Sequence, residues 1–213
     1  MIYEIFRIIG LITGYIPQLL FFKRKTYYVD KKRTSFKGGK LIVTNHFSMF
    51  DYVLSAFIVF PRKLNVVTSE MPFKNKFLKF GMKFFGAIEA NRETKNMSFI
   101  DKSVDDLKKG KLVQIYPEGR NSPDGKMHAF KPSYTVIAHR ANVPIILIIT
   151  DGNYGIFKRT SVLISEEIDI SEFIDKNSKI TKKEDRNRLN EFIHNKALQM
   201  REDLEKLKQQ KRR

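Results

Sequence analysis

The sequence contains no cysteine in its 213 residues, which excludes disulfide bonds, thiolate metal sites and a cysteine nucleophile. It also lacks four common active-site signatures: the GxxxxGK[ST] phosphate loop, the GxGxxG dinucleotide motif, the GxSxG nucleophile elbow and the HExxH metal motif. The four histidines, at positions 46, 128, 139 and 194, show no ligand-like clustering. We therefore expect no metal site.

Acidic residues are scarce relative to basic ones. The chain has 23 Asp and Glu against 40 Lys and Arg, a formal net charge of +17. Such a charge predicts attraction to a polyanion: nucleic acid, an anionic membrane surface or a phosphorylated substrate. No nucleic-acid-binding motif accompanies the charge, and the basic residues are spread along the whole chain. We therefore expect no nucleic-acid partner.

The N-terminal apolar stretch, Ile8–Phe22, is shorter than the roughly 20 residues that span a bilayer, and Gly10, Gly14 and Pro17 weaken a straight helix. A buried first helix and a single tilted span are both open. We favour a helix in the membrane interface, with the basic cluster 23–25 touching anionic headgroups. The expected location is the cytoplasmic face of the cell membrane, as a peripheral or monotopic protein.

Continuous apolar runs predict strands buried on both faces of a sheet, and helix-like segments alternate with them. The expected strands are 41–44, 64–68, 111–116 and 143–150, and the expected helices are 51–60, 73–85, 97–109 and 132–141. This alternation predicts an α/β fold with a mostly parallel central sheet flanked by helices. Segment 161–170 is typical of a later, more exposed strand.

Three regions are expected along the chain: a membrane-associated helical segment (1–26), an α/β core (27–180) and a basic C-terminal helix (181–213). The last has apolar residues at helical spacing and a charged face, which indicates a solvated or membrane-apposed helix. In segment 73–85, phenylalanines recur on one helix face, which favours core packing. The alternatives are a helix that walls an acyl groove and a helix that dips into lipid.

His46 and Asp51 follow the apolar run 41–43. A strand that ends here, followed by a helix that begins near Asp51, places both side chains at the carboxyl edge of a parallel sheet, where α/β proteins usually bind ligands. Asp51 can then accept a hydrogen bond from one imidazole nitrogen and leave the other as a base. No enzyme nucleophile is evident, so the proton removed would belong to a substrate hydroxyl.

Two further polar clusters follow strand-like segments. The turn after 111–116 supplies Glu118, Gly119 and Arg120, and segment 86–93 supplies Arg92. An arginine beside a glycine suits a phosphate monoester, because its guanidinium makes charge-assisted hydrogen bonds. A plain surface turn would explain either cluster alone, but three clusters after three strands indicate a site.

These motifs resemble those of the glycerolipid acyltransferase family that includes the 1-acylglycerol-3-phosphate acyltransferases. The family's Asn-His-x-x-x-x-Asp motif stands at Asn45–Asp51, and its second motif resembles Gly86–Arg92. Its Phe-Pro-Glu-Gly-Thr-Arg-Ser motif corresponds to Tyr116–Ser122, and its Val-Pro strand to Val143–Ile146. Lys131 matches the lysine of the family's Phe-Lys-x-Gly segment. In the third motif, however, the arginine lies one place earlier than in the family.

The resemblance implies direct acyl transfer from a coenzyme A or acyl-carrier-protein thioester to the free hydroxyl of lysophosphatidic acid, giving phosphatidic acid. His46, oriented by Asp51, would be the general base. Arg92 and Arg120, with Glu118, Gly119 and Lys131 around them, would bind the acceptor. No cofactor is implied, because the thioester is a co-substrate. Glycerol 3-phosphate or another lysolipid as acceptor, and a non-catalytic basic membrane- or nucleic-acid-binding module, are the open alternatives.

Overall fold

The described strands of the computed structural model form one sheet. The structure describes residues 2–69, 81–82, 85–90, 97–122, 124–174 and 182–210. Within them, seven strands lie in the order β1-β7-β6-β2-β5-β3-β4. Their bounds are β1 (Lys25–Tyr28), β2 (Lys40–Thr44), β3 (Leu64–Ser69), β4 (Ala87–Ala90), β5 (Leu112–Ile115), β6 (Ile145–Thr150) and β7 (Ser161–Ile164).

Neighbouring strands pair in parallel except β6 and β7, which are antiparallel. The carboxyl ends of β2, β3, β4, β5 and β6 therefore meet at one edge of the sheet, which we call the site edge. The polar clusters that follow β2 and β5 in the sequence leave the sheet there. The residues that follow β4, Arg92 among them, lie outside the described residues. The expected α/β fold with a mostly parallel sheet is confirmed.

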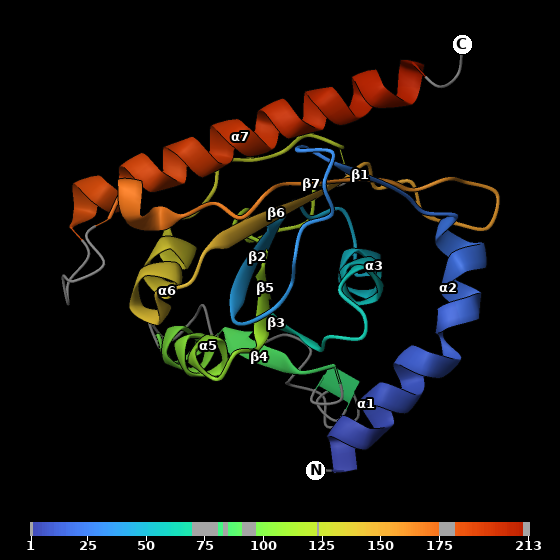
Figure 1. Ribbon diagram of the computed structural model, residues 1–213, viewed down its shortest axis with the longest axis horizontal. Helices are drawn as coiled ribbons and strands as arrows, with labels where there is room; N and C mark the ends of the chain where they lie inside the picture. The colour runs from blue at the N-terminus through green and yellow to red at the C-terminus, as the bar shows by residue number, and fades with distance from the viewer. Residues whose placement is uncertain are drawn as a thin grey trace.

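Helices flank the sheet on both faces (Figure 1). The four expected strands correspond to β2, β3, β5 and β6, and three expected helices correspond to α3, α5 and α6. The helices bounded within the described residues are α1 (Ile2–Thr13), α2 (Tyr15–Phe22), α3 (Phe50–Ile58), α5 (Ser98–Lys108), α6 (Ser133–Ala141) and α7 (Lys183–Gln210), with a 3₁₀ turn η2 (Ile170–Glu172). The expected helix 73–85 and its phenylalanine stripe lie mostly outside the described residues.

Alternation along β2 divides the core into two layers. Leu41 and Val43 point to one face, which α5, α6 and α7 cover, and Ile42 points to the other, where Phe22 of α2 and Leu54 of α3 pack. Strand β6 is buried along its whole length, as its continuous apolar sequence predicts. The segment between β2 and α3 is therefore held between two packed layers, which gives the site edge a rigid base.

The segment 161–170 differs from expectation. Only Ser161–Ile164 forms a strand, and all four of its residues are buried. The expected exposure is wrong, because β1 adds to the far side of β7 and completes the sheet. The short strand β1 has no apolar run that would have predicted it.

The N-terminal segment forms two helices that meet at Gly14. A Cβ at this position would lie 2.8 Å from the Gly10 carbonyl oxygen, and Pro17 falls in the first turn of α2, where no backbone N–H is needed. Among the described residues, no single helix is long and apolar enough to cross a bilayer. The pair α1–α2 meets these criteria only when taken together, with a bend of 49°.

One side of α1 and α2 packs against the fold, since Arg7, Gln18 and Phe22 are buried. The other side carries exposed apolar side chains: Ile5, Phe6, Ile8, Ile9, Ile12, Ile16, Leu19 and Leu20. A membrane location for this apolar side stays a prediction.

Helix α7 runs along one face of the molecule (Figure 1). It buries Leu189, Ile193, Ala197, Met200 and Leu204 in the core. Its apolar stripe therefore packs against the sheet and α6, while its charged side faces away. The expected boundary at residue 26 falls inside β1, and the helix expected from residue 181 begins at residue 183.

Candidate active site

His46 and Asp51 form a hydrogen-bonded pair at the site edge. His46 lies just beyond β2, and Asp51 is in the first turn of α3. The distance from His46 Nδ1 to Asp51 Oδ2 is 2.9 Å, and Asp51 is 1% exposed. Because an ionised carboxylate only accepts hydrogen bonds, Nδ1 carries the hydrogen and Nε2 is left as the basic nitrogen. The expected proximity of the two side chains is present in the structure.

Four donors converge on the Asp51 carboxylate. Besides His46, the backbone N–H groups of Phe47 and Ser48 donate to Oδ2 at 2.7 and 2.8 Å. The hydroxyl of Tyr154 donates to the other oxygen, Oδ1. These bonds, together with the N-terminal end of α3, stabilise the negative charge of a buried carboxylate. They also fix its orientation toward the imidazole.

Tyr154 lies in the loop between β6 and β7 and was not predicted. Its hydroxyl also lies 3.3 Å from Thr150 Oγ1, and its ring packs on Phe22. Burial raises the pKa of Tyr154 above the usual value for tyrosine, and the charge of Asp51 raises it further. The phenol therefore keeps its proton and remains a donor to Asp51.

Tyr116 stacks on the imidazole of His46, with ring centroids 3.9 Å apart and an interplanar angle of 18°. Its hydroxyl accepts a hydrogen bond from Gln114 Nε2 at 3.1 Å. Burial raises the pKa of Tyr116 well above its usual value, with a smaller contribution from Asp51. This neutral ring restricts rotation of the His46 side chain on one face.

Glu118 holds two loops against the pair. Its Oε1 accepts from the backbone N–H of His46 at 3.0 Å, and its Oε2 accepts from Ser122 Oγ at 2.6 Å and from the backbone N–H of His128 at 2.8 Å. The backbone N–H of Ser122 donates in turn to the His46 carbonyl at 2.7 Å. Glu118 is 4% exposed. We interpret it as a residue that joins the loops after β2 and β5, and its predicted part in acceptor binding stays a prediction.

Beside Glu118 lies a basic pocket of about 520 Å³. Arg120, His128 and Lys131 line it, together with Glu118, Gly119 and Ala129. Arg120 Nη2 donates to His128 Nδ1 at 3.0 Å, and Nδ1 of His128 is therefore the acceptor. Arg120 and Lys131 are exposed cations, and cations of this kind make charge-assisted hydrogen bonds to phosphate groups. Phosphate binding here stays a prediction.

Gly119 allows Lys131 to reach this pocket. Its φ is +68°, in the left-handed region, and a Cβ there would lie 3.2 Å from Lys131 Nζ. The backbone N–H of Lys131 donates to the Pro117 carbonyl at 2.9 Å, which fixes the lysine beside the turn. Arg120, Lys131 and Gly119 therefore meet as the sequence predicts. Arg92 lies outside the described residues, and its place at this site stays a prediction.

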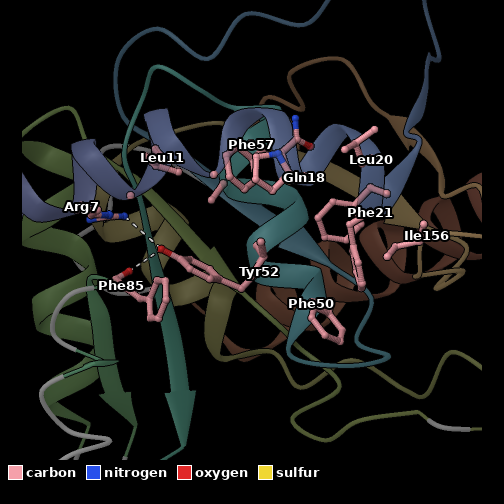
Figure 2. Close-up of a pocket in the computed structure, with 16 residues that line it drawn as sticks. Arg7, Leu11, Gln18, Leu20, Phe21, Phe50, Tyr52, Phe57, Phe85 and Ile156 are labelled. Carbon is pink, nitrogen blue, oxygen red and sulfur yellow. Dashed lines mark hydrogen bonds between the residues drawn. The ribbon is translucent and has the colours of Figure 1, made fainter.

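A second pocket, of about 700 Å³, lies between the N-terminal helices and α3 (Figure 2). Its walls are mostly apolar, and they include Phe50 and Tyr52, which flank Asp51 in the sequence. At one end, Arg7 donates to Asn65 Oδ1 at 2.9 Å and to the Leu64 carbonyl, which ties α1 to β3. The His-Asp pair thus contacts wall residues of both pockets. It reaches the basic pocket through Glu118 and the apolar pocket through the start of α3.

Comparisons with known proteins identify the family of the chain. A family model described as Acyltransferase matches residues 23–150, more than half of the chain. The chain belongs to the acyltransferase family. The match begins at the end of the N-terminal helices and ends with β6, so it includes the His-Asp pair and the basic pocket. The remaining helix α7 and strand β7 lie beyond it.

This acyltransferase is also similar to individual proteins. It is 26% identical over 121 residues to a Caenorhabditis elegans protein that is provisionally named as a 1-acyl-sn-glycerol-3-phosphate acyltransferase, and the match covers 55% of this chain but 43% of that protein. Its fold resembles the crystal structure of the 1-acyl-sn-glycerophosphate (LPA) acyltransferase PlsC from Thermotoga maritima. That match has a TM-score of 0.57 and 18% identity, and it covers 87% of this chain and 73% of that chain.

Sequence reasoning missed the parts of the site that come from outside the motifs of this acyltransferase. Tyr154 is one of several tyrosines in the chain, and no local pattern connects it with Asp51. His128 was noted only as one of four histidines without ligand-like clustering. Tyr116 was noticed as a motif residue, but its stacking on His46 depends on the register between β2 and β5.

Proposed function

We propose that this acyltransferase moves a fatty acyl group from an acyl thioester, carried by coenzyme A or acyl carrier protein, to the free hydroxyl of 1-acyl-sn-glycerol 3-phosphate. The product is phosphatidic acid. The observation that carries the proposal is the oriented His46–Asp51 pair beside a basic pocket on the same edge of the sheet. The names of both similar proteins support this choice of acceptor.

The proposed step begins at His46 Nε2, the nitrogen that faces away from Asp51. It takes the proton of the acceptor hydroxyl as the hydroxyl oxygen attacks the thioester carbonyl carbon. The tetrahedral intermediate collapses, the carbon–sulfur bond breaks, and the leaving thiolate takes the proton from the imidazolium. Asp51 stabilises that imidazolium. General-base assistance of this kind contributes roughly 10²- to 10⁴-fold in rate, and the step needs no metal or bound cofactor.

The basic pocket is the proposed site for the acceptor phosphate. A phosphate held by Arg120 and Lys131 lies beside Glu118, whose carboxylate is bonded to the His46 backbone. In the proposed complex, the glycerol hydroxyl of the acceptor extends from this pocket toward the base. Positioning of two reactants can supply as much as about 7–11 kcal/mol of the barrier, so phosphate binding is expected to matter as much as the base.

The apolar pocket is the proposed site for an acyl chain. Its volume falls within the range of about 300–1,000 Å³ that is typical of small-molecule sites. Leu11, Phe21 and Phe57 contribute apolar wall, and Figure 2 shows how they surround the space between α1, α2 and α3. A fatty acyl chain can bury its methylene groups there while its carbonyl carbon stays near the start of α3.

The proposed location is the membrane interface, at the cytoplasmic face of the cell membrane. The exposed apolar side of α1 and α2 and the net charge of +17 support attraction to an anionic surface. Because both the acceptor and the product are lipids, a membrane-apposed site edge would shorten their path to the pocket.

An acyl-transfer assay with a panel of acceptors tests the proposal. Lysophosphatidic acid, glycerol 3-phosphate and uncharged or zwitterionic lysolipids would be offered with each thioester donor. We expect lysophosphatidic acid to be preferred and His46→Ala to reduce transfer by at least about 10²-fold. The matched control is His194→Ala, which removes a half-buried histidine of α7 that packs on Phe130. Undiminished transfer by a folded His46→Ala protein would refute the mechanism.

A further inference from the structure

The loop between β6 and β7, residues 151–160, exposes two large apolar side chains at its tip. The backbone N–H of Lys158 donates to the Gly155 carbonyl at 2.9 Å, which closes a turn with Ile156 and Phe157 at its two central positions. Turn centres usually carry Gly, Pro, Asn, Asp or Ser. Here Ile156 is 57% exposed and Phe157 is 98% exposed. Exposure of both side chains to water is unfavourable, which indicates that the turn contacts an apolar environment when the protein functions.

This loop is fastened to the end of α2. The backbone N–H of Thr160 donates to the Phe22 carbonyl at 2.9 Å, and the backbone N–H of Lys25 donates to the Thr160 carbonyl at 2.8 Å. Figure 1 shows the loop projecting from the sheet on the side where α2 lies. Ile156 borders the same apolar pocket as Leu20, and Figure 2 shows the two side chains near each other. The loop tip therefore extends the exposed apolar side of the N-terminal helices.

Basic residues surround this combined apolar surface. Lys158 and Arg159 follow the tip and are exposed, and Lys23 is exposed at the end of α2. Segment 8–29 contains no acidic residue, and the only acidic residue of the loop, Asp151, is buried. An apolar tip followed by cations matches an anionic bilayer interface, in which apolar groups enter the acyl region and cations meet the headgroups.

We propose that the 151–160 loop is a second membrane-docking element, which inserts Ile156 and Phe157 into an anionic bilayer beside α1 and α2. The same loop carries Tyr154, whose hydroxyl orients Asp51. Docking of the loop tip therefore keeps this hydroxyl close to the membrane surface. The inference depends on the proposed function only for the idea that this membrane supplies the lipid acceptor. Vesicle binding involves no acyl transfer, so the two proposals fail separately.

The chain contains no tryptophan, so one introduced tryptophan reports on its own surroundings. Phe157→Trp is the test variant. Phe192→Trp is the control, at a 39% exposed position of α7 that packs on Phe173. Full-length protein is mixed with vesicles of phosphatidylcholine and phosphatidylglycerol. We expect the emission of Phe157→Trp to shift to the blue and to be quenched by brominated lipid, whereas Phe192→Trp stays unchanged.

A binding measurement accompanies the fluorescence. Phe157→Ser should lower the partition coefficient onto these vesicles by roughly tenfold or more, because the variant has no phenylalanine ring to bury in the bilayer. Phe192→Ser should leave the partition coefficient unchanged. Joint replacement of Lys158 and Arg159 by serine should weaken binding to the phosphatidylglycerol vesicles but not to pure phosphatidylcholine.

Two results would overturn the inference. An unshifted Phe157→Trp emission on vesicles that sediment the protein would show that α1 and α2 dock without the loop. A blue shift that appears without vesicles and grows with protein concentration would assign Ile156 and Phe157 to a contact between two copies of the chain.

Discussion

The hydroxyl of Tyr154 donates a hydrogen bond to Asp51 across 103 residues of sequence. This bond joins the loop after β6 to the first turn of α3, and through Asp51 it reaches His46. The base is therefore oriented by a chain of three side chains rather than by its immediate sequence neighbours alone. Its position depends on three separate segments that meet at the site edge.

The Tyr154 bond predicts a defect in turnover rather than in acceptor binding. Tyr154→Phe keeps the ring that packs on Phe22 but removes the donor to Asp51. A hydrogen bond to a charged group contributes about 1.5–3 kcal/mol, so we expect kcat to fall by roughly tenfold or more. The KM for lysophosphatidic acid should change little, because Tyr154 does not line the basic pocket. Steady-state kinetics on folded protein check this, and an unchanged kcat would remove Tyr154 from the orienting chain.

Asp51→Asn is expected to affect both rate and stability. In the wild type, the backbone N–H groups of Phe47 and Ser48 and the Tyr154 hydroxyl all donate to the Asp51 carboxylate. The amide of the variant keeps one acceptor oxygen but turns an NH₂ group, itself a donor, toward these donors. At least one donor then loses its partner, at a cost of about 1–3 kcal/mol in the free energy of unfolding. Acyl transfer should fall by at least about 10²-fold, because the imidazole loses its orienting acceptor. Urea unfolding and initial rates measure the two effects, and full activity would contradict the proposed role of Asp51.

The basic pocket predicts a selective loss of acceptor affinity. Arg120→Ala and Lys131→Ala should each raise the KM for lysophosphatidic acid by roughly 10-fold, because a charge-assisted hydrogen bond to phosphate is lost, and should leave the KM for the thioester nearly unchanged. Arg140→Ala is the control. It removes an arginine of α6 whose exposed side chain forms an ion pair with Asp101 of α5. If both pocket variants keep the wild-type acceptor KM, the phosphate binds elsewhere, and Arg92 becomes the first residue to test.

Much of this arrangement could be predicted from local sequence, and the rest could not, for a physical reason. Continuous apolar runs identify β2, β5 and β6, and the residues directly after a parallel strand must leave at its carboxyl edge, so His46 and Arg120 could be placed without coordinates. Tyr154 could not, because its contact with Asp51 depends on how β7 pairs with β6 and where the intervening loop folds. The same dependence on strand pairing explains why burial of the segment 161–164 was missed.

The contact between Gly152 and Phe47 predicts the effect of one added methyl group. Gly152 has a φ of +70°, and a Cβ there would lie 2.7 Å from Phe47 Cδ2, which is closer than packed carbon atoms approach one another. Gly152→Ala must therefore displace the Phe47 ring, whose backbone N–H donates to Asp51 at 2.7 Å. Gly110→Ala is the matched control, since Gly110 has a φ of +75° and a Cβ added there would meet nothing within 4 Å.

Gly110→Ala should lose about 1–2 kcal/mol of unfolding free energy, because a left-handed backbone disfavours a Cβ. Gly152→Ala should lose at least as much, because its Cβ also displaces Phe47. Only Gly152→Ala should also lower kcat, by roughly 10- to 100-fold, because small displacements of reacting groups slow catalysis by such factors. Parallel unfolding and kinetic measurements on the two variants separate backbone strain from displacement of the turn that holds His46. Equal kcat in the two variants would mean that the position of Phe47 does not control the base.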